Sequence, residues 1–134
     1  MSKLLKIQSQ KHKQVLDITE LVNEHLESLG ATTGLCHIFS KHTTTAISVA
    51  DLDSGGTDLD YLEAFEKIVP KLNYRHPHDP SHMPDHVLSA GIGPGTLVPV
   101  VKGTLDLGTW QRVLFFDFDG PKQREIVVTI IEQK

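Results

Sequence analysis

Two long apolar runs near the C-terminal end of the chain constrain its fold more than any other feature. The runs are RVLFFDF at residues 112–118 and REIVVTII at residues 124–131, separated by a segment that contains DGP. Both are rich in the β-branched and aromatic residues that favour strands, and the glycine-bearing turn between them predicts a hairpin. An antiparallel strand with one face in water alternates apolar and polar residues, and these strands do not. We therefore expect a second sheet, a helix or another subunit to cover their second face.

The rest of the chain predicts further strands and two or three helices. Strand patterns occur at residues 5–8, 34–40, 44–50 and 96–101, with a short strand, TLDL, after the turn at Lys102-Gly103. Helical spacing of apolar residues covers residues 17–30 and 58–72, and a brief helix begins near Pro84. The segments predict an α+β fold of mixed or antiparallel, sandwich-like sheets with packed helices, in one domain over residues 1–134.

Helix ends also carry sequence signals. Asp17 is expected to cap the first helix, with Glu20 in capping-box register, and Gly30 is expected to end it. Thr57 is expected to cap the second helix, which places Asp60 at its third position.

Composition excludes several classes of protein. The chain has 134 residues and a net charge of −4, which argues against a broad nucleic-acid surface. Its single cysteine, Cys36, lies among apolar strand residues, where neither a disulfide nor a reactive nucleophile is expected. The first residues lack the apolar core of a signal peptide, and no run is long enough to span a membrane. We expect a cytoplasmic protein that contacts neither membrane nor nucleic acid.

Histidine is unusually concentrated in one segment. Four of the eight histidines fall within residues 76–86. His76 and His78 have strand-like spacing, whereas His82 and His86 have i,i+4 spacing interrupted by Pro84. Imidazole is a common ligand of zinc and other divalent metals, but the segment matches no HExxH pattern. Spacing alone slightly favours a solvated surface loop over a metal site.

A second group of polar residues brackets the strand at residues 44–50. His42 lies at its start, where the ring can face a cleft shared with the histidine segment. The hydroxyls of Thr43 and Thr44 can bind phosphate oxygens, although threonine is also an ordinary strand residue. Asp51 follows the strand directly and can act as a base or orient a ligand, whereas Asp60 is also explained by its place at a helix start.

The segment GTWQR gives further candidates. Trp110 can stack on a ligand ring or fill core space, and core is the usual role of a lone tryptophan. Arg112 and Arg124 can grip a phosphate, with exposed salt bridges as the commoner alternative. The segment GIGPGTL at residues 91–97 lacks the spacing of known nucleotide loops.

Several of these motifs together resemble the YjbQ-like family of small proteins, often labelled secondary thiamine-phosphate synthase. The resemblance covers nearly the whole chain. The matching segments are HTTTAISVAD, DLD, YRH, DH, GPGTLVPV and GTLDLGTWQRVLFFDFDGPKQREIVVTI. The most specific part is the pairing of His-Thr-Thr near the middle with Leu-Gly-Thr-Trp-Gln near the end. Three positions depart from the family pattern: Ala50 stands for Asn, Asp51 for Glu, and Asp85 for Ala.

The resemblance implies a homotrimer with a metal-holding pocket of histidines and acids near a subunit boundary. Three matched histidines are the implied ligands of a divalent ion, zinc or magnesium: His42, His76 and His86. Asp51 and Asp60 are the implied catalytic acids. The implied contacts to a phosphorylated small molecule are Thr43, Thr44, Trp110, Gln111 and Arg124. His78 and His82 match nothing in the family and return to the surface-loop interpretation.

Three hypotheses follow. The first is a metal-dependent enzyme with weak thiamine-phosphate synthase activity, in which a thiazole phosphate attacks a pyrimidine diphosphate. The second is a trimeric metal- or ligand-binding protein without turnover, since the chain shows no nucleophile. The third is a trimeric interaction protein with incidental histidines. The enzyme requires its histidines to converge beside an acid and a cavity, and the interaction protein requires them to be scattered.

Overall fold

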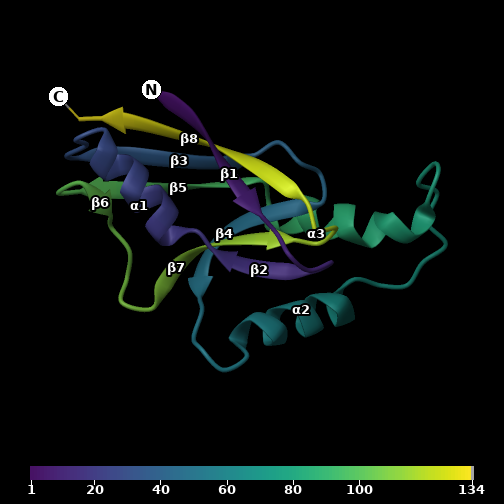
Figure 1. The fold of residues 1–134 in the computed structure, drawn as a ribbon. Helices are drawn as coiled ribbons and strands as arrows, with labels where there is room; N and C mark the ends of the chain where they lie inside the picture. The colour runs from purple at the N-terminus through teal and green to yellow at the C-terminus, as the bar shows by residue number, and fades with distance from the viewer. Residues whose placement is uncertain (134) are drawn as a thin grey trace.

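A computed structural model describes residues 1–133, with strands and helices spread along the chain (Figure 1). The elements in chain order are β1 Ser2–Gln8, β2 Gln14–Asp17, α1 Thr19–Ser28, β3 Gly34–Ser40, β4 Thr45–Asp51, α2 Thr57–Ile68, the short 3-10 helix η1 Pro80–His82, α3 Met83–Ile92, β5 Gly95–Val101, β6 Thr104–Leu105, β7 Gln111–Asp117 and β8 Gln123–Glu132.

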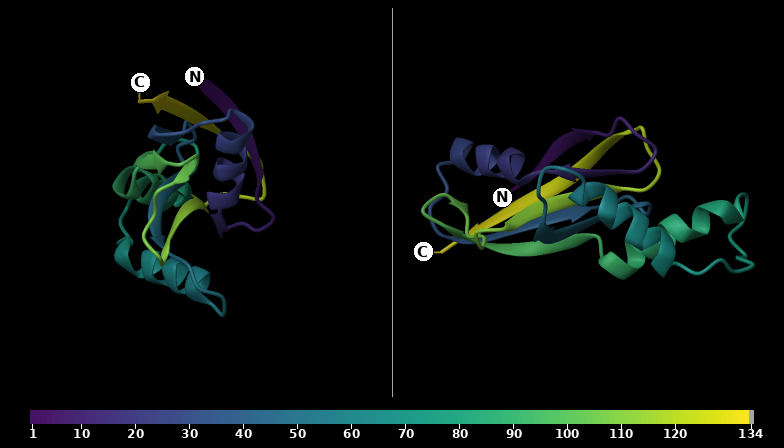
Figure 2. Two further views of the ribbon diagram at one scale, coloured as in Figure 1. Left: turned by 90° about the vertical axis from the view of Figure 1, so that its left-hand side faces the viewer. Right: turned by 90° about the horizontal axis from the view of Figure 1, so that it is seen from below.

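The strands form two antiparallel sheets. The larger sheet has the order β1-β8-β3-β5-β6, and the smaller has the order β2-β7-β4. The sheets pack over a common core, with α1 at one end of the molecule and α3 at the other (Figure 2). This arrangement confirms the α+β prediction. Strand β2 escaped prediction because its four residues carry too short a pattern.

The predicted hairpin of the two apolar runs is wrong. The runs become β7 and β8, which lie in different sheets. Strand β7 pairs with β2 and β4, and β8 pairs with β1 and β3, so neither has a free edge for the other. The chain passes between the sheets at residues 118–122, where Phe118 donates its N–H to Thr44 O and Lys122 O accepts from Ser9 N.

The apolar character of β7 is explained within the chain. Val113 and Phe115 face the core between the sheets, where they meet the larger sheet and α1. Leu114 and Phe116 face the opposite way and pack against α2 and α3. Both faces of β7 are therefore covered, as its lack of alternation required.

The larger sheet is covered on one face only. Its outer face carries exposed aliphatic side chains from four strands: Leu4, Leu35, Leu97, Val101 and Ile131. Ile131 is 63% exposed and Leu97 is 57% exposed. We call these five residues the outer sheet face. Single exposed apolar residues are ordinary, but a cluster that spans neighbouring strands is typical of a surface that contacts another molecule.

The helix ends agree in part with the sequence signals. Gly30 follows α1 with φ of 64°, a conformation that favours glycine. The cap predictions are wrong in detail: Ile18 is the N-cap of α1, and Asp17, one residue earlier, accepts the N–H of Thr19. Gly56 caps α2 because φ of 120° suits glycine, so Thr57 is already helical and forms no capping box. Within residues 1–133, no helix has the length and apolar character needed to span a membrane.

Candidate functional site

His86 is held in a defined orientation on α3. Its ring Nδ1 lies 2.8 Å from the carbonyl oxygen of Thr43, which can only accept, so Nδ1 carries the proton and donates. The other nitrogen, Nε2, then has a free lone pair. A ligating histidine commonly donates its second nitrogen to a backbone carbonyl in this way. The backbone of Thr43 therefore prepares His86 to bind a metal or to accept a proton.

His76 lies beside His86. The ring centroids are 4.8 Å apart and the rings are tilted by 59°. His76 comes from the irregular segment between α2 and η1, ten residues before His86, so this segment folds back onto α3. The structure thus brings together two of the three histidines predicted as metal ligands.

His42 has a different role in hydrogen bonding. Its Nε2 accepts the backbone N–H of Glu125 at 3.2 Å, which leaves the ring proton on Nδ1. Burial, followed by the positive charge of Arg124, lowers the pKa of His42 from its ordinary value of 6.5. The ring is therefore neutral at pH 7, and in this arrangement its Nδ1 is a donor rather than a metal ligand.

His42 and His86 line one open pocket. Its volume is about 610 Å³, and its wall includes Thr43, Met83 and Ala90. We call it the histidine pocket. Thr43 is exposed there, whereas Thr44 is buried and points its hydroxyl towards Arg124. The two threonines of the loop before β4 therefore differ: Thr43 can contact a ligand, whereas the hydroxyl of Thr44 hydrogen-bonds in the interior.

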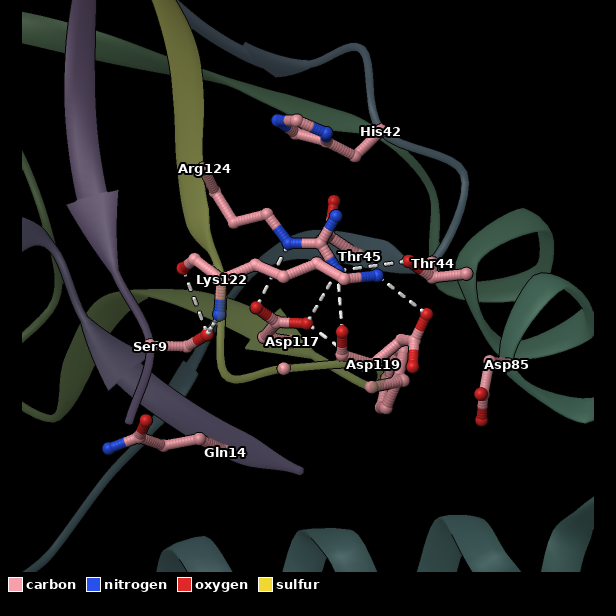
Figure 3. A network of polar contacts seen from close by, with 12 residues as sticks. Ser9, Gln14, His42, Thr44, Thr45, Asp85, Asp117, Asp119, Lys122 and Arg124 are labelled. Atoms are coloured by element: carbon pink, nitrogen blue, oxygen red, sulfur yellow. Dashed lines mark hydrogen bonds and ion pairs between the residues drawn. The ribbon is translucent and has the colours of Figure 1, made fainter. Parts of the chain in front are cut away.

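Arg124 is at the centre of a buried polar network beneath His42 (Figure 3). Its Nε donates to one oxygen of Asp117 at 3.0 Å, and its Nη2 donates to the other at 2.9 Å. Nη2 also donates to the hydroxyl of Thr44 at 3.0 Å and to Asp119 O at 3.3 Å. Such a two-pronged ion pair fixes the guanidinium firmly. The alternative of an exposed salt bridge is wrong for Arg124, because both partners are buried.

Asp117 is the acid that the sequence analysis missed. Burial alone would raise the pKa of Asp117, but hydrogen bonds from Arg124 and from the N–H of Asp119 hold it below the ordinary 3.8. A signal was available, since an acid inside the apolar run RVLFFDF must have a partner when buried. Asp117 and Arg124 join the end of β7 to the start of β8 and so fix the floor below His42.

The remaining predicted site residues gather at the opposite end of β4. Asp51 pairs with Gln111 across β4 and β7, and its backbone carbonyl accepts from the hydroxyl of Tyr61. Desolvation, followed by the neighbouring charge of Asp53, raises the pKa of Asp51. Trp110 is 72% exposed, so the expectation that it fills core space is wrong. We call Asp51, Asp60, Trp110 and Gln111 the tryptophan end.

The two groups of residues cannot meet within one chain. Strand β4 runs from Thr45 to Asp51, and seven strand residues span roughly 20 Å. Asp60 is exposed in the first turn of α2, which follows Asp51 and its loop. The structure therefore places the predicted catalytic acids at the far end of the strand from the histidine pocket.

Metal-ligating residues gather only in part. Within residues 1–133, no three histidine, cysteine or acidic side chains lie close enough together to hold a metal ion. His82 pairs with Asp79 at 3.3 Å on the exposed side of the segment, and His78 is exposed. Cys36 is buried in β3, and burial raises the pKa of its thiol to about 11, which keeps it protonated.

The geometry defines a class: a small two-sheet α+β protein with a histidine-lined pocket near the start of β4, an edge strand of the smaller sheet. The sequence model of the family described as "UPF0047 protein YjbQ-like" matches residues 3–133. The chain belongs to this YjbQ-like family. Its motifs therefore predicted the family correctly.

Known relatives agree in sequence and in structure. A UPF0047 protein of Archaeoglobus fulgidus is 38% identical over 125 residues, which cover 92% of this chain and 96% of the relative. The UPF0047 protein YugU of Bacillus subtilis is 31% identical over 131 residues, or 98% and 99% of the two chains. The crystal structure of hypothetical protein APE1520 from Aeropyrum pernix has a TM-score of 0.91 and 30% identity, with 99% of each chain covered.

Proposed function

We propose that this protein is a metal-dependent enzyme that acts on a small phosphorylated molecule, with chemistry of the thiamine-phosphate synthase type, in the cytoplasm. One observation carries the proposal. The Thr43 carbonyl holds Nδ1 of His86 and leaves Nε2 free, while His86 lines an open pocket and its ring lies 4.8 Å from the ring of His76. Such an arrangement serves a ligating imidazole.

Two imidazole donors suit a divalent cation whose other coordination positions are open to further ligands. His76 and His86 would hold it, and substrate oxygens would complete its shell, as is usual where protein ligands are few. His42, the third predicted ligand, would have to give up the hydrogen bond from Glu125. We therefore propose that His42 donates from Nδ1 to the substrate. A bound cation would neutralise the negative charge that develops on a leaving pyrophosphate.

The chain's other residues would bind and position the substrate. The exposed hydroxyl of Thr43 can donate to a phosphate oxygen at the pocket wall. Arg124 is proposed to act through structure: Asp117 and Thr44 hold it, and it supports the loop that carries His42. In the proposed reaction, a thiazole nitrogen forms a bond to the methylene carbon of a pyrimidine diphosphate as pyrophosphate leaves.

A homotrimer would unite the two ends of β4. Trp110 is exposed at one end, and the histidine pocket is open at the other. The outer sheet face offers an apolar surface for contact between copies. We propose that the tryptophan end of one chain completes the histidine pocket of its neighbour. There the carboxylate of Asp51 or Asp60 stabilises the positive charge that the thiazole ring gains, and Trp110 stacks on the substrate ring with Gln111 beside it.

A trimeric binding protein without turnover is the second candidate. It is favoured by one observation, namely that residues 1–133 of a single chain gather no three metal-ligating side chains. If copies do not bring the tryptophan end to the pocket, the histidines can bind an ion without any acid to assist chemistry.

Two measurements separate these candidates. Elemental analysis of purified protein should find a divalent metal that His86→Ala removes and that the exposed control His12→Ala retains. Equal metal in both variants would remove His86 from the site. The wild-type gene should then rescue a thiamine-requiring strain that lacks its normal synthase, whereas His42→Ala should not. Metal binding without rescue would favour the binding protein.

A further inference from the structure

A second cavity lies between α2 and α3, apart from the histidine pocket. Its volume is about 130 Å³. The wall is mostly apolar and is formed by Leu62, Phe65, Val69, Leu88 and Phe118. Helix α3 separates the two cavities, since no residue lines both. An apolar cavity of roughly 150 Å³ is large enough to bind benzene.

One carboxylate is set into this apolar wall. Asp85 is only 5% exposed, and its Oδ1 accepts from Lys13 Nζ at 2.7 Å. Lys13 also lies 5.9 Å from the centre of the Phe118 ring, which fixes the ammonium group at the rim of the cavity. The ion pair is therefore part of the lining.

The second oxygen of Asp85 is available to a ligand. Among the hydrogen bonds of residues 1–133, only Oδ1 of this carboxylate has a partner, so Oδ2 has none. Oδ2 keeps some contact with solvent, because no fully buried polar side-chain atom in these residues lacks a hydrogen bond. A ligand that fills the cavity would displace water from this oxygen, so the ligand must bring a donor of its own, because an unmade hydrogen bond in an apolar setting is costly. Lys13 already balances the charge, so the matching donor is neutral.

We propose that this cavity binds a small neutral molecule made of one apolar ring and a hydroxyl or N–H group, which donates to Oδ2 of Asp85. The ring fills the space between Phe65, Leu88 and Phe118. The cavity volume limits the ligand to about a single ring. The adjoining groove at Ile68 and Ile92 shares Phe65 and Leu88 with the cavity and leaves room for a short apolar substituent.

The test is a titration of the full chain with phenol and, separately, with toluene, followed by backbone amide NMR. Phenol should give saturable shifts centred on Phe65, Asp85 and Leu88. Toluene has a similar size but no donor, and it should bind about tenfold more weakly, as expected for loss of a hydrogen bond to a charged group. Asp85→Leu should remove this preference, whereas Glu63→Leu, an exposed acid of α2 outside the cavity, should preserve it.

Each other outcome overturns the proposal. Binding of neither probe, or shifts centred on the histidine pocket, would show that the cavity takes no such ligand. Equal affinity of the wild-type protein for phenol and toluene would exclude Asp85 as the acceptor. If Asp85→Leu does not fold, the wild-type ratio of the two affinities decides alone. The result is independent of any metal or turnover at His86.

Discussion

The two ends of β4 differ in how their polar residues are held. At the first end, Thr44, Asp117 and Arg124 form a buried network below the histidine pocket, in which both oxygens of Asp117 accept from Arg124. At the other end, Asp51 and Trp110 are exposed. The first set of side chains is therefore fixed by contacts within the chain, whereas the second set is open to solvent. Under our proposal, a second copy would cover that second set.

The largest expected effect breaks the rigid end. Asp117→Ala leaves the Arg124 guanidinium buried without its partner and should lower the free energy of unfolding by about 3–5 kcal/mol, measured by urea denaturation. The exposed control Asp53→Ala should change it by less than about 0.5 kcal/mol. The double variant Asp117→Leu/Arg124→Met should recover most of the loss, because it removes both charges. A loss below about 1 kcal/mol for Asp117→Ala would mean that the network does not hold this end together.

The second prediction concerns the outer sheet face. Leu97→Lys places a charge in the middle of the proposed contact between copies, where burying it is costly. Light scattering should therefore find the wild type near three times 14.9 kDa and the variant near 14.9 kDa. Leu59→Lys, at an exposed leucine of α2, is the matched control and should leave the mass unchanged. A wild-type mass of one chain would refute the shared site.

The third prediction separates stability from function at the tryptophan end. Trp110→Ala should change the free energy of unfolding by no more than about 0.5 kcal/mol, because the side chain is exposed. Phe116→Ala, which empties a buried position, should cost about 3–5 kcal/mol. Trp110→Ala should nevertheless abolish rescue of the thiamine-requiring strain. Full rescue by this variant would limit the site to the histidine pocket of one chain.

The smallest predicted effect is a pH dependence. The folded protein holds the pKa of Asp117 below its ordinary 3.8, so the unfolded chain takes up this proton at higher pH. The stabilisation by Asp117 is therefore complete above about pH 3.8 and is lost as the pH falls below that value. The Asp117→Leu/Arg124→Met variant should lose less stability than the wild type between pH 4 and pH 2, measured by thermal unfolding. Parallel losses would exclude Asp117 as the titrating group.

The sequence predicted what depends on local pattern. Alternation and apolar runs identified most strands, and helical spacing identified α1 and α2. Pro84 indicated the start of α3, and Gly30 marked the end of α1. The pairing of β7 with β2 and β4 was not predictable in this way, because a tight turn suggests a hairpin regardless of which distant strands are available to pair. Partner choice depends on contacts far apart in the chain, and local sequence does not record them.

The site, like the fold, was predicted only where the local sequence carries a signal. The family motifs identified His76 and His86, which lie together, although spacing alone favoured a surface loop. Neither signal could show that β4 separates these histidines from Asp51. Asp117 was overlooked although an acid inside an apolar run indicates a buried partner, because local sequence does not show that Arg124 is that partner. Residue types indicate which chemistry is possible, whereas the distance between the two ends of β4 determines which residues can belong to one site.

The most direct test of the histidine pocket as the functional site is a crystal soaked with zinc and scanned for anomalous scattering. We predict a peak about 2.0–2.1 Å from Nε2 of His86, with His76 as a second ligand. A peak bound elsewhere, with none beside His86, would contradict the assignment of this pocket as the metal site.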